Sequence, residues 1–329
     1  MTALRTTVTR TSPSDRLVGR ALPSPNSSAT REVDPMIGHL IGDSAGIVSI
    51  RKQIRRLTER QADARRALPI LIVGETGTGK GLVAWAIHAT GPRAHKPFVQ
   101  VNCAAVPETL FEAELFGFEK GAFTGARHAK AGLFHAAARG TIFLDELSCL
   151  PLALQAKLLK VVEQRTMRRI GSTQEEPMDA WIIAASSDNL LARTREGRFR
   201  EDLYHRLAVV SLELPPLRQR GRDIQLLAER FLARACAEYG VPARTLAFSA
   251  RAALLAHPWP GNVRELSNLM ERVVLLSEET QVTAETLDFV DPRAQEPAAA
   301  PGHRGDARDA ERRPGSIPAG SSAAGRLRA

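Results

Sequence analysis

Pro69-Ile-Leu-Ile-Val-Gly-Glu-Thr-Gly-Thr-Gly-Lys80 is the stretch that decides the fold. Its apolar first half is typical of a strand buried on both faces, and a helical pattern follows the lysine. The glycines between them let backbone N–H groups face a phosphate, and Lys80 supplies a point charge for the β- and γ-phosphates. The alternative is a plain glycine turn with a surface lysine, and the strand–loop–helix context disfavours it. The residues expected to contact a nucleotide here are Gly74, Glu75, Thr76, Gly77, Thr78, Gly79, Lys80, Gly81 and Leu82.

Two adjacent acids end another apolar run, Gly140-Thr-Ile-Phe-Leu-Asp-Glu146. Because side chains alternate along a strand, Asp145 and Glu146 are expected to point to opposite sides and do different jobs. We expect Asp145 to hold the Mg²⁺ shell and Glu146 to polarise the attacking water. Carboxylates often merely mark a strand end, but their position downstream of the phosphate loop favours catalysis. Gly81 stands where the general motif has Ser or Thr for Mg²⁺, so other groups and water must hold the metal.

The middle of the chain alternates strand and helix patterns, which predicts an α/β fold with a parallel sheet covered by helices. Further strands are expected at Phe98-Val-Gln-Val101 and Trp181-Ile-Ile-Ala-Ala185, and an amphipathic helix over residues 44–60. After the Pro215-Pro216 pair the strand pattern stops and helical spacing takes over. We therefore expect a nucleotide-binding α/β subdomain over residues 37–214 and a small all-helical lid subdomain over residues 215–291.

The two ends of the chain have a different composition. Residues 1–36 contain fifteen Ser, Thr or Pro, and Ala, Gly, Pro and Arg make up 27 of residues 292–329. Neither segment carries enough large apolar side chains to offset its ordering entropy. We expect a disordered leader and a disordered tail; a mitochondrial transit peptide is the less favoured interpretation of the leader.

Charge, cysteine content and hydropathy limit the class of protein. The net charge is +9, but part of it lies in the two ends, so it is a weak sign of DNA binding. The tail also lacks the apolar periodicity of a helix-turn-helix, so DNA is expected only indirectly or through a partner. Three distant cysteines and no apolar run near ~18 residues predict a reduced, cytoplasmic protein without a membrane span.

A second motif makes the family recognisable. Glu114-Leu-Phe-Gly-Phe-Glu-Lys-Gly-Ala-Phe-Thr-Gly-Ala126, together with the phosphate loop, resembles the AAA+ ATPase domain of bacterial sigma-54-dependent transcriptional activators. The resemblance covers about residues 41–289 and implies Mg²⁺-dependent ATP hydrolysis that remodels sigma-54 RNA polymerase for promoter opening. It also implies a homo-oligomeric ring, expected as a hexamer. The loop residues that it assigns to sigma-54 contact are Gly121, Ala122, Phe123, Thr124, Gly125 and Ala126.

The resemblance assigns roles to four further residues, one residue at a time. Asn102 matches the switch asparagine that holds the catalytic glutamate until nucleotide is sensed. Arg200 and Arg206 match the arginines that reach a neighbouring subunit's ATP, where a positive charge stabilises the transferring phosphoryl group. Arg264, in Trp259-Pro-Gly-Asn-Val-Arg264, matches the second sensor. Taken singly, Arg200 and Arg206 also fit surface ion pairs, and Glu265 could offset the charge of Arg264 at the start of its helix.

The sequence departs from the family pattern at a few site positions. Gly81 replaces the usual glutamate, Ser186 and Ser187 replace the threonine and asparagine of the first sensor, and Phe118 replaces a histidine. These changes put the hydrolysis rate in doubt more than ATP binding. The main alternative is therefore a nucleotide-binding module that hydrolyses little and binds sigma-54 or co-assembles with active relatives. A helicase or clamp loader is a third possibility, and the signature loop argues against it.

Overall fold

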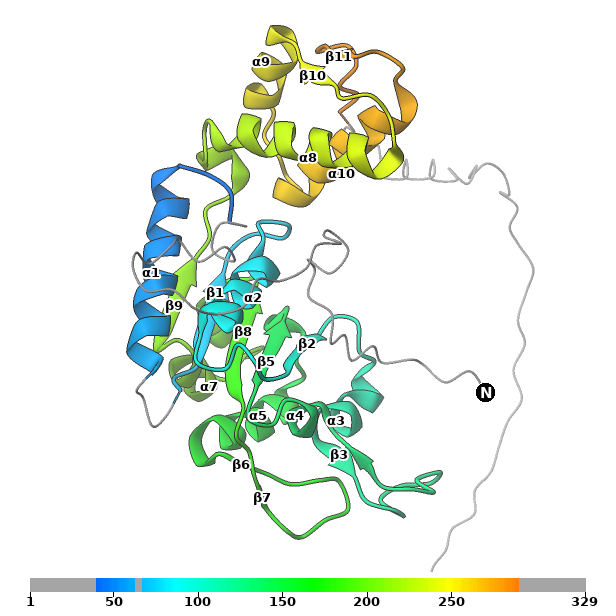
Figure 1. Cartoon of the computed structure of the whole chain (residues 1–329). Helices are drawn as coiled ribbons and strands as arrows, with labels where there is room; N and C mark the ends of the chain where they lie inside the picture. The colour runs from blue at the N-terminus through cyan, green and yellow to red at the C-terminus, as the bar shows by residue number, and fades with distance from the viewer. Residues whose placement is uncertain (1–39, 63–66, 290–329) are drawn as a thin grey trace, which may run out of the picture. The chain divides into compact units, whose positions relative to one another are not determined.

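The structure is a computed structural model that describes residues 40–62 and 67–289 (Figure 1). The expected leader over residues 1–36 and the tail over 292–329 lie outside the described residues. The described residues up to Asp288 belong to one compact unit. No helix among residues 40–62 and 67–289 is long and apolar enough to cross a membrane.

A five-stranded parallel sheet with the order β2-β5-β8-β1-β9 forms the centre of the α/β part (Figure 1). The strands are β1 (Ile70–Val73), β2 (Phe98–Asn102), β5 (Thr141–Asp145), β8 (Trp181–Ser186) and β9 (Val210–Glu213). The inner strands β1, β5 and β8 are buried along most of their length, as expected of strands that helices cover on both faces. The edge strands β2 and β9 include exposed polar residues. The parallel α/β fold predicted from the sequence is confirmed.

Alternating side chains divide the core between the two faces of the sheet. Leu71 and Ile142 pack in one cluster against α3 (Glu108–Phe116), α4 (Leu133–Ala136), α5 (Leu152–Gln164) and α7 (Glu201–Leu207). Ile72 and Phe143 pack in the other against α1 (Ala45–Ala62) and α2 (Lys80–Thr90). The short helix α6 (Leu190–Arg195) and the 3₁₀ turn η2 (Leu147–Cys149) complete this part.

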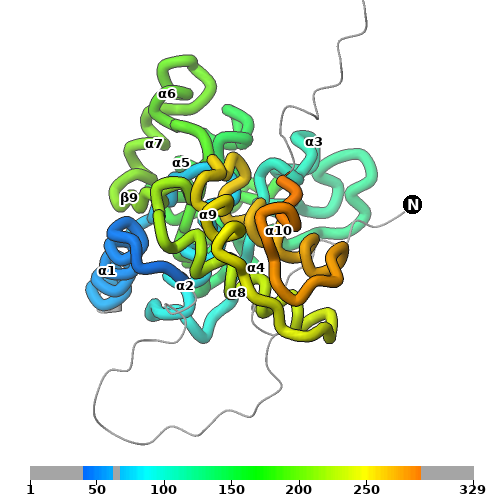
Figure 2. Tube along the Cα trace, turned by 90° about the horizontal axis from the view of Figure 1, so that it is seen from above, coloured from blue at the N-terminus to red at the C-terminus, as the bar shows by residue number. Residues whose placement is uncertain are grey.

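The helical lid follows β9. It contains the 3₁₀ turn η3 (Leu217–Gln219) and the helices α8 (Asp223–Tyr239), α9 (Phe248–Ala256) and α10 (Asn262–Leu276). Figure 2 shows these three helices gathered together, and Trp259 lies fully buried among them. A two-residue parallel pair, β10 (Thr245–Leu246) with β11 (Gln281–Val282), was not expected from the sequence, because two residues carry no readable period.

Two antiparallel hairpins extend from the α/β part. The first pairs β3 (Gly117–Phe118) with β4 (Lys130–Ala131) and carries the signature loop, residues 121–126. The second pairs β6 (Thr166–Met167) with β7 (Glu176–Pro177). The first hairpin meets the second through a bridge between Phe118 and Ile170, and the Glu119 amide donates to the Ile170 carbonyl at 3.0 Å.

Candidate functional site

The glycine-rich loop leaves β1 and turns directly into α2. Gly77 and Gly79 have φ of 80° and 103°, in the left-handed region that favours glycine. The loop is also closed internally, since the Thr78 hydroxyl donates to the Glu75 carbonyl at 2.8 Å. These conformations bring the start of α2 next to the end of β1, where a helix N-terminus attracts anions.

A cavity of about 410 Å³ opens beside this loop, which is a size typical of ligand sites. Residues from the loop, the end of β5 and the lid helices surround it. The lining residues are Thr76, Gly77, Gly79, Lys80, Gly81, Leu82, Gln100, Asp145, Glu146, Phe231, Val263, Arg264, Ser267 and Asn268. The cavity therefore joins the phosphate loop, both expected acids and the expected second sensor in one place.

Within the described part of the chain, Lys80 is one of two cations that line the cavity, and only 6% of its side chain is exposed. Its ammonium donates to the Gly74 carbonyl at 2.9 Å and lies 3.4 Å from Glu146 Oε1. A buried ammonium needs such partners, because an unpaired charge in the interior is costly. The same group has three donors and belongs to the first residue of α2, directly after the glycine loop.

Asp145 and Glu146 line the same cavity, so the expectation that they point to opposite sides was wrong. The strand β5 ends at Asp145, and Glu146 adopts φ 51° at the start of η2. Strand alternation does not extend beyond the last strand residue. Burial and the neighbouring Glu146 charge raise the pKa of the Asp145 carboxyl.

The Glu146 carboxylate is held by Ser187. The Ser187 hydroxyl donates to Glu146 Oε2 at 2.6 Å, and the Ser187 amide donates to the same oxygen at 3.2 Å. Asn102 makes a different contact, because its side-chain oxygen accepts from the Ala104 amide at 2.9 Å. In the sequence Ser187 stood out only as a departure from the family pattern. The contact arises because β5 and β8 are neighbours and their carboxyl ends meet at one edge of the sheet.

The three expected arginines occupy two different places. Arg264 is in the first turn of α10 and lines the cavity. Arg200, the residue directly before α7, and Arg206, on α7, do not line it; their side chains lie at the surface, 42% and 59% exposed. There they pair with acids of the same chain, Arg200 with Asp202 at 2.6 Å and Arg206 with Glu163 at 2.6 Å. Both guanidiniums are thus accessible to another molecule.

The signature loop presents Phe123 at its tip, with 46% of the residue exposed. The loop is closed by the Gly121 amide donating to the Ala126 carbonyl at 2.8 Å. The Phe118 ring meets the Phe123 ring edge-on, with centroids 4.9 Å apart. Gly121 and Gly125 have φ of 84° and 101°, so both need glycine. Phe123 therefore remains outside the core, and the aromatic residue at position 118 supports it.

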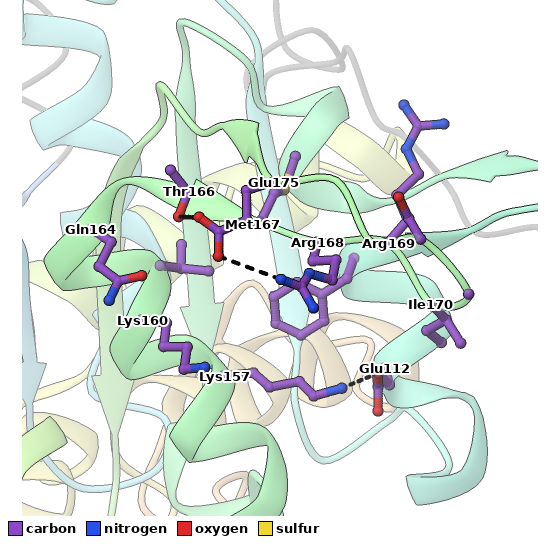
Figure 3. A pocket seen from close by; sticks show the side chains of 14 residues that line it. Glu112, Lys157, Lys160, Gln164, Thr166, Met167, Arg168, Arg169, Ile170 and Glu175 are labelled. Atoms are coloured by element: carbon purple, nitrogen blue, oxygen red, sulfur yellow. Dashed lines mark hydrogen bonds and ion pairs between the residues drawn. The ribbon is translucent and has the colours of Figure 1, made fainter.

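A second cavity, of about 370 Å³, lies between α3, α5 and the β6–β7 hairpin (Figure 3). Its lining includes the buried Phe116, Val161 and Met167. At its rim Lys157 pairs with Glu112, and Arg168 lies 3.7 Å from Glu175 (Figure 3). Lys160 and Arg169 also line this cavity, so its described lining has more basic than acidic side chains.

The acids of the first cavity fit Mg²⁺ bound together with a nucleotide. Among the residues that the structure describes, no group of three or more His, Cys, Asp or Glu could enclose a metal ion. Mg²⁺ does not require such a cage, because it commonly keeps several waters and binds one or two carboxylates plus substrate phosphates. Asp145, which lines the cavity beside the glycine loop, supplies such a carboxylate.

Two family models match the chain, and together they cover most of the described residues. A sigma-54 interaction domain matches residues 40–213, and an AAA+ ATPase lid domain matches residues 218–302. The chain is 45% identical to the response regulator PilR of Pseudomonas aeruginosa, over 86% of this chain and 62% of PilR. It is 46% identical to the regulatory protein AtoC of Escherichia coli, over 76% of this chain and 53% of AtoC.

Solved structures of a related protein share the fold. NtrX from Brucella abortus in complex with ADP matches with a TM-score of 0.67 and 38% identity, over 75% of this chain and 55% of that chain. The same protein in complex with ATP matches with a TM-score of 0.66. The chain spans about half to three fifths of the length of these relatives. It belongs to the sigma-54 interaction domain family, the AAA+ family of sigma-54-dependent transcriptional regulators.

Proposed function

We propose that this protein hydrolyses ATP in the cavity beside the glycine loop and uses the cycle to remodel sigma-54 RNA polymerase. The observation that carries the proposal is the convergence of Lys80, Asp145, Glu146 and Arg264 on one cavity next to an anion-binding loop. The NtrX structures with ADP and ATP support a nucleotide as the ligand of this fold. Membership of the sigma-54 interaction domain family supports the partner.

The residues of the cavity divide the chemistry between them. Loop amides and Lys80 bind the phosphates, and Arg264 adds positive charge from the lid side. Glu146 is the candidate general base, since a carboxylate held in place can orient and polarise a water for attack on the γ-phosphate. The Ser187 hydroxyl fixes the direction of that carboxylate at 2.6 Å. Mg²⁺, when bound near Asp145, would neutralise phosphate charge.

The signature loop is the proposed contact with sigma-54. Phe123 and Thr124 are exposed at its tip, and an exposed aromatic side chain is a common anchor in protein interfaces. Arg200 and Arg206 are the proposed fingers for a neighbouring subunit's nucleotide, which requires a ring such as a hexamer. Their accessible positions at the start of α7 and on it, outside the lining of the chain's own cavity, support that assignment.

Two measurements test the proposal. Purified protein is expected to release phosphate from ATP and to increase open-complex formation at a sigma-54 promoter in an ATP-dependent way. Lys80→Ala should weaken ATP binding by about 1.5–3 kcal/mol, the value of hydrogen bonds to charged groups. Glu146→Ala should bind ATP without turning it over. Absence of ATP-dependent opening at high protein concentration would refute the remodelling function.

The weakly hydrolysing alternative rests on Gly81 and Ser187. Gly81 offers no side chain to Mg²⁺, and Ser187 reaches less far than the asparagine of relatives. A wild-type turnover that disappears in Glu146→Ala would exclude this alternative. ATP binding and sigma-54 capture without measurable turnover would establish it.

A further inference from the structure

Four consecutive residues of the glycine loop, 75–78, form hydrogen bonds with the segment that leads into the lid and with the start of α10. Glu75 does so through its side chain. The Glu75 carboxylate accepts two hydrogen bonds from the Arg218 guanidinium, at 2.8 and 2.5 Å, and a third from the Asn262 amide at 3.1 Å. Bidentate pairs of this kind have a fixed geometry as well as a favourable energy.

The next three residues are bonded through their carbonyl groups. The Thr76 carbonyl accepts from the Asn262 side-chain amide at 3.0 Å. The Gly77 carbonyl accepts from the Val263 and Arg264 amides at 3.0 and 3.3 Å. The Thr78 carbonyl accepts from the Arg220 guanidinium at 2.9 Å. All three carbonyls thus point toward donors supplied from beyond β9.

Asn262 is the centre of this arrangement. It is fully buried and adopts φ 53°. Its amide nitrogen uses both hydrogens, one on Glu75 and one on Thr76, while its oxygen accepts from the Leu217 amide at 2.7 Å. Asn is among the non-glycine residues that adopt this left-handed conformation most readily, and the three hydrogen bonds hold its side-chain amide in one orientation.

The direction of the carbonyls determines the direction of the loop amides. A trans peptide is planar, and its C=O and N–H point to opposite sides. When the Thr76 and Thr78 carbonyls face the lid donors, the N–H groups of Gly77 and Gly79 face the other way. Both glycines line the cavity. The bonds from the lid therefore orient the amides that would meet phosphate.

We propose that Asn262, with Arg218 and Arg220, sets the phosphate-binding shape of the glycine loop, and that Asn262 is a positioning residue for the nucleotide. The inference deepens the proposed function, because it concerns the same cavity. The loop and the lid also approach too closely to move independently: a Cβ at Gly77 would lie 2.2 Å from the Gly261 carbonyl oxygen. A lid that shifts must break these bonds and release the loop.

Asn262→Asp tests the donor role at nearly constant volume. The variant keeps an acceptor for the Leu217 amide but places a carboxylate oxygen against Glu75 and the Thr76 carbonyl. We expect the Kd for a fluorescent ATP analogue, measured by anisotropy, to rise about tenfold or more. We also expect faster amide exchange over residues 75–79 in the ligand-free protein. In the double variant Asn262→Asp with Glu75→Gln, part of the affinity should return, because the new amide can donate to the new carboxylate.

A matched control removes a comparable ion pair inside the lid. Arg251 lies 2.5 Å from Glu229, and neither residue lines the cavity. Arg251→Ala should leave the ATP affinity within about twofold of wild type. If Asn262→Asp folds poorly, Arg218→Ala, at a position 44% exposed, tests the same contact on Glu75.

The outcomes separate this inference from the proposed function. An Asn262→Asp protein with wild-type ATP affinity and unchanged exchange over residues 75–79 would overturn the inference, even if its melting temperature fell. Wild-type protein that binds no ATP analogue would refute the proposed nucleotide site instead. The exchange measurement on ligand-free protein would still test whether the lid orients the loop.

Discussion

Removing the Ser187 hydroxyl tests how the proposed base is held. In Ser187→Ala the Glu146 carboxylate loses its 2.6 Å bond and keeps the 3.2 Å bond from the backbone amide and the 3.4 Å approach of Lys80. A hydrogen bond to a charged group contributes about 1.5–3 kcal/mol, and each 1.36 kcal/mol in the barrier is tenfold in rate. We therefore expect kcat to fall about 10- to 100-fold.

The assay is steady-state phosphate release over a range of ATP concentrations. The KM for ATP should change little, because Ser187 is not among the residues that line the cavity. Ser187→Thr keeps the hydroxyl and should retain most of the turnover. Ser249→Ala, which removes a 3.3 Å bond to Ala284 within the lid, is the matched control. A Ser187→Ala protein with wild-type kcat would refute the assignment of this serine.

Three other predictions concern Gly81, His88 and Phe118. A Cβ at Gly81 would meet only Phe143, at 3.8 Å, so the side chain of Gly81→Ser should fit. The variant should raise the free energy of unfolding by ~0.5 kcal/mol in thermal unfolding and lower the Mg²⁺ concentration needed for half-maximal turnover. An unchanged Mg²⁺ requirement would contradict this prediction. Burial lowers the pKa of His88 from 6.5 to about 4, so the unfolded chain takes up a proton at this residue before the folded protein does. The free energy of unfolding should therefore be unaffected by His88 above pH 6.5 and should fall as the pH drops toward 4, by on the order of 3 kcal/mol in total. Urea unfolding at pH 7 and pH 5 should show about 2 kcal/mol of that loss in wild type and a smaller loss in His88→Gln. An equal loss of unfolding free energy in the two proteins would refute the prediction. Phe118→Leu removes the edge-on ring contact with Phe123, which contributes ~0.5–1.5 kcal/mol. The loss should speed chymotrypsin cleavage at Phe123. An unchanged cleavage rate would show that the ring contact does not restrain the tip of the signature loop.

The sheet and its helices could be predicted from sequence because their signals are long or repeated. The run before Gly74 has no polar residue, and α10 keeps its apolar spacing over four turns. The hairpins that carry and support the signature loop could not be predicted in this way. Each has strands of two residues, and their pairing depends on contacts between segments about fifty residues apart, such as Phe118 with Ile170.

The candidate site was predictable as a set of residues and less so as a geometry. The glycine loop, Asp145, Glu146 and Arg264 could be found from motifs. The direction of Glu146 could not, because it depends on a left-handed residue just after the strand. The Ser187 contact and the bonds of Asn262 to the loop depend on which strands are neighbours and on how the lid meets the loop, which a single sequence does not encode as a local pattern.

Amide exchange of the signature-loop hairpin, residues 117–131, is the most direct test of coupling between the proposed nucleotide cavity and the proposed sigma-54 contact. The protein would be compared without nucleotide, with ADP, and with ADP plus a metal fluoride that mimics the γ-phosphate. We expect protection around Phe123 to differ between the phosphate-mimic state and the other two. Equal exchange in all three states, with the cavity shown to be filled, would contradict the coupling of ATP hydrolysis to movement of this loop.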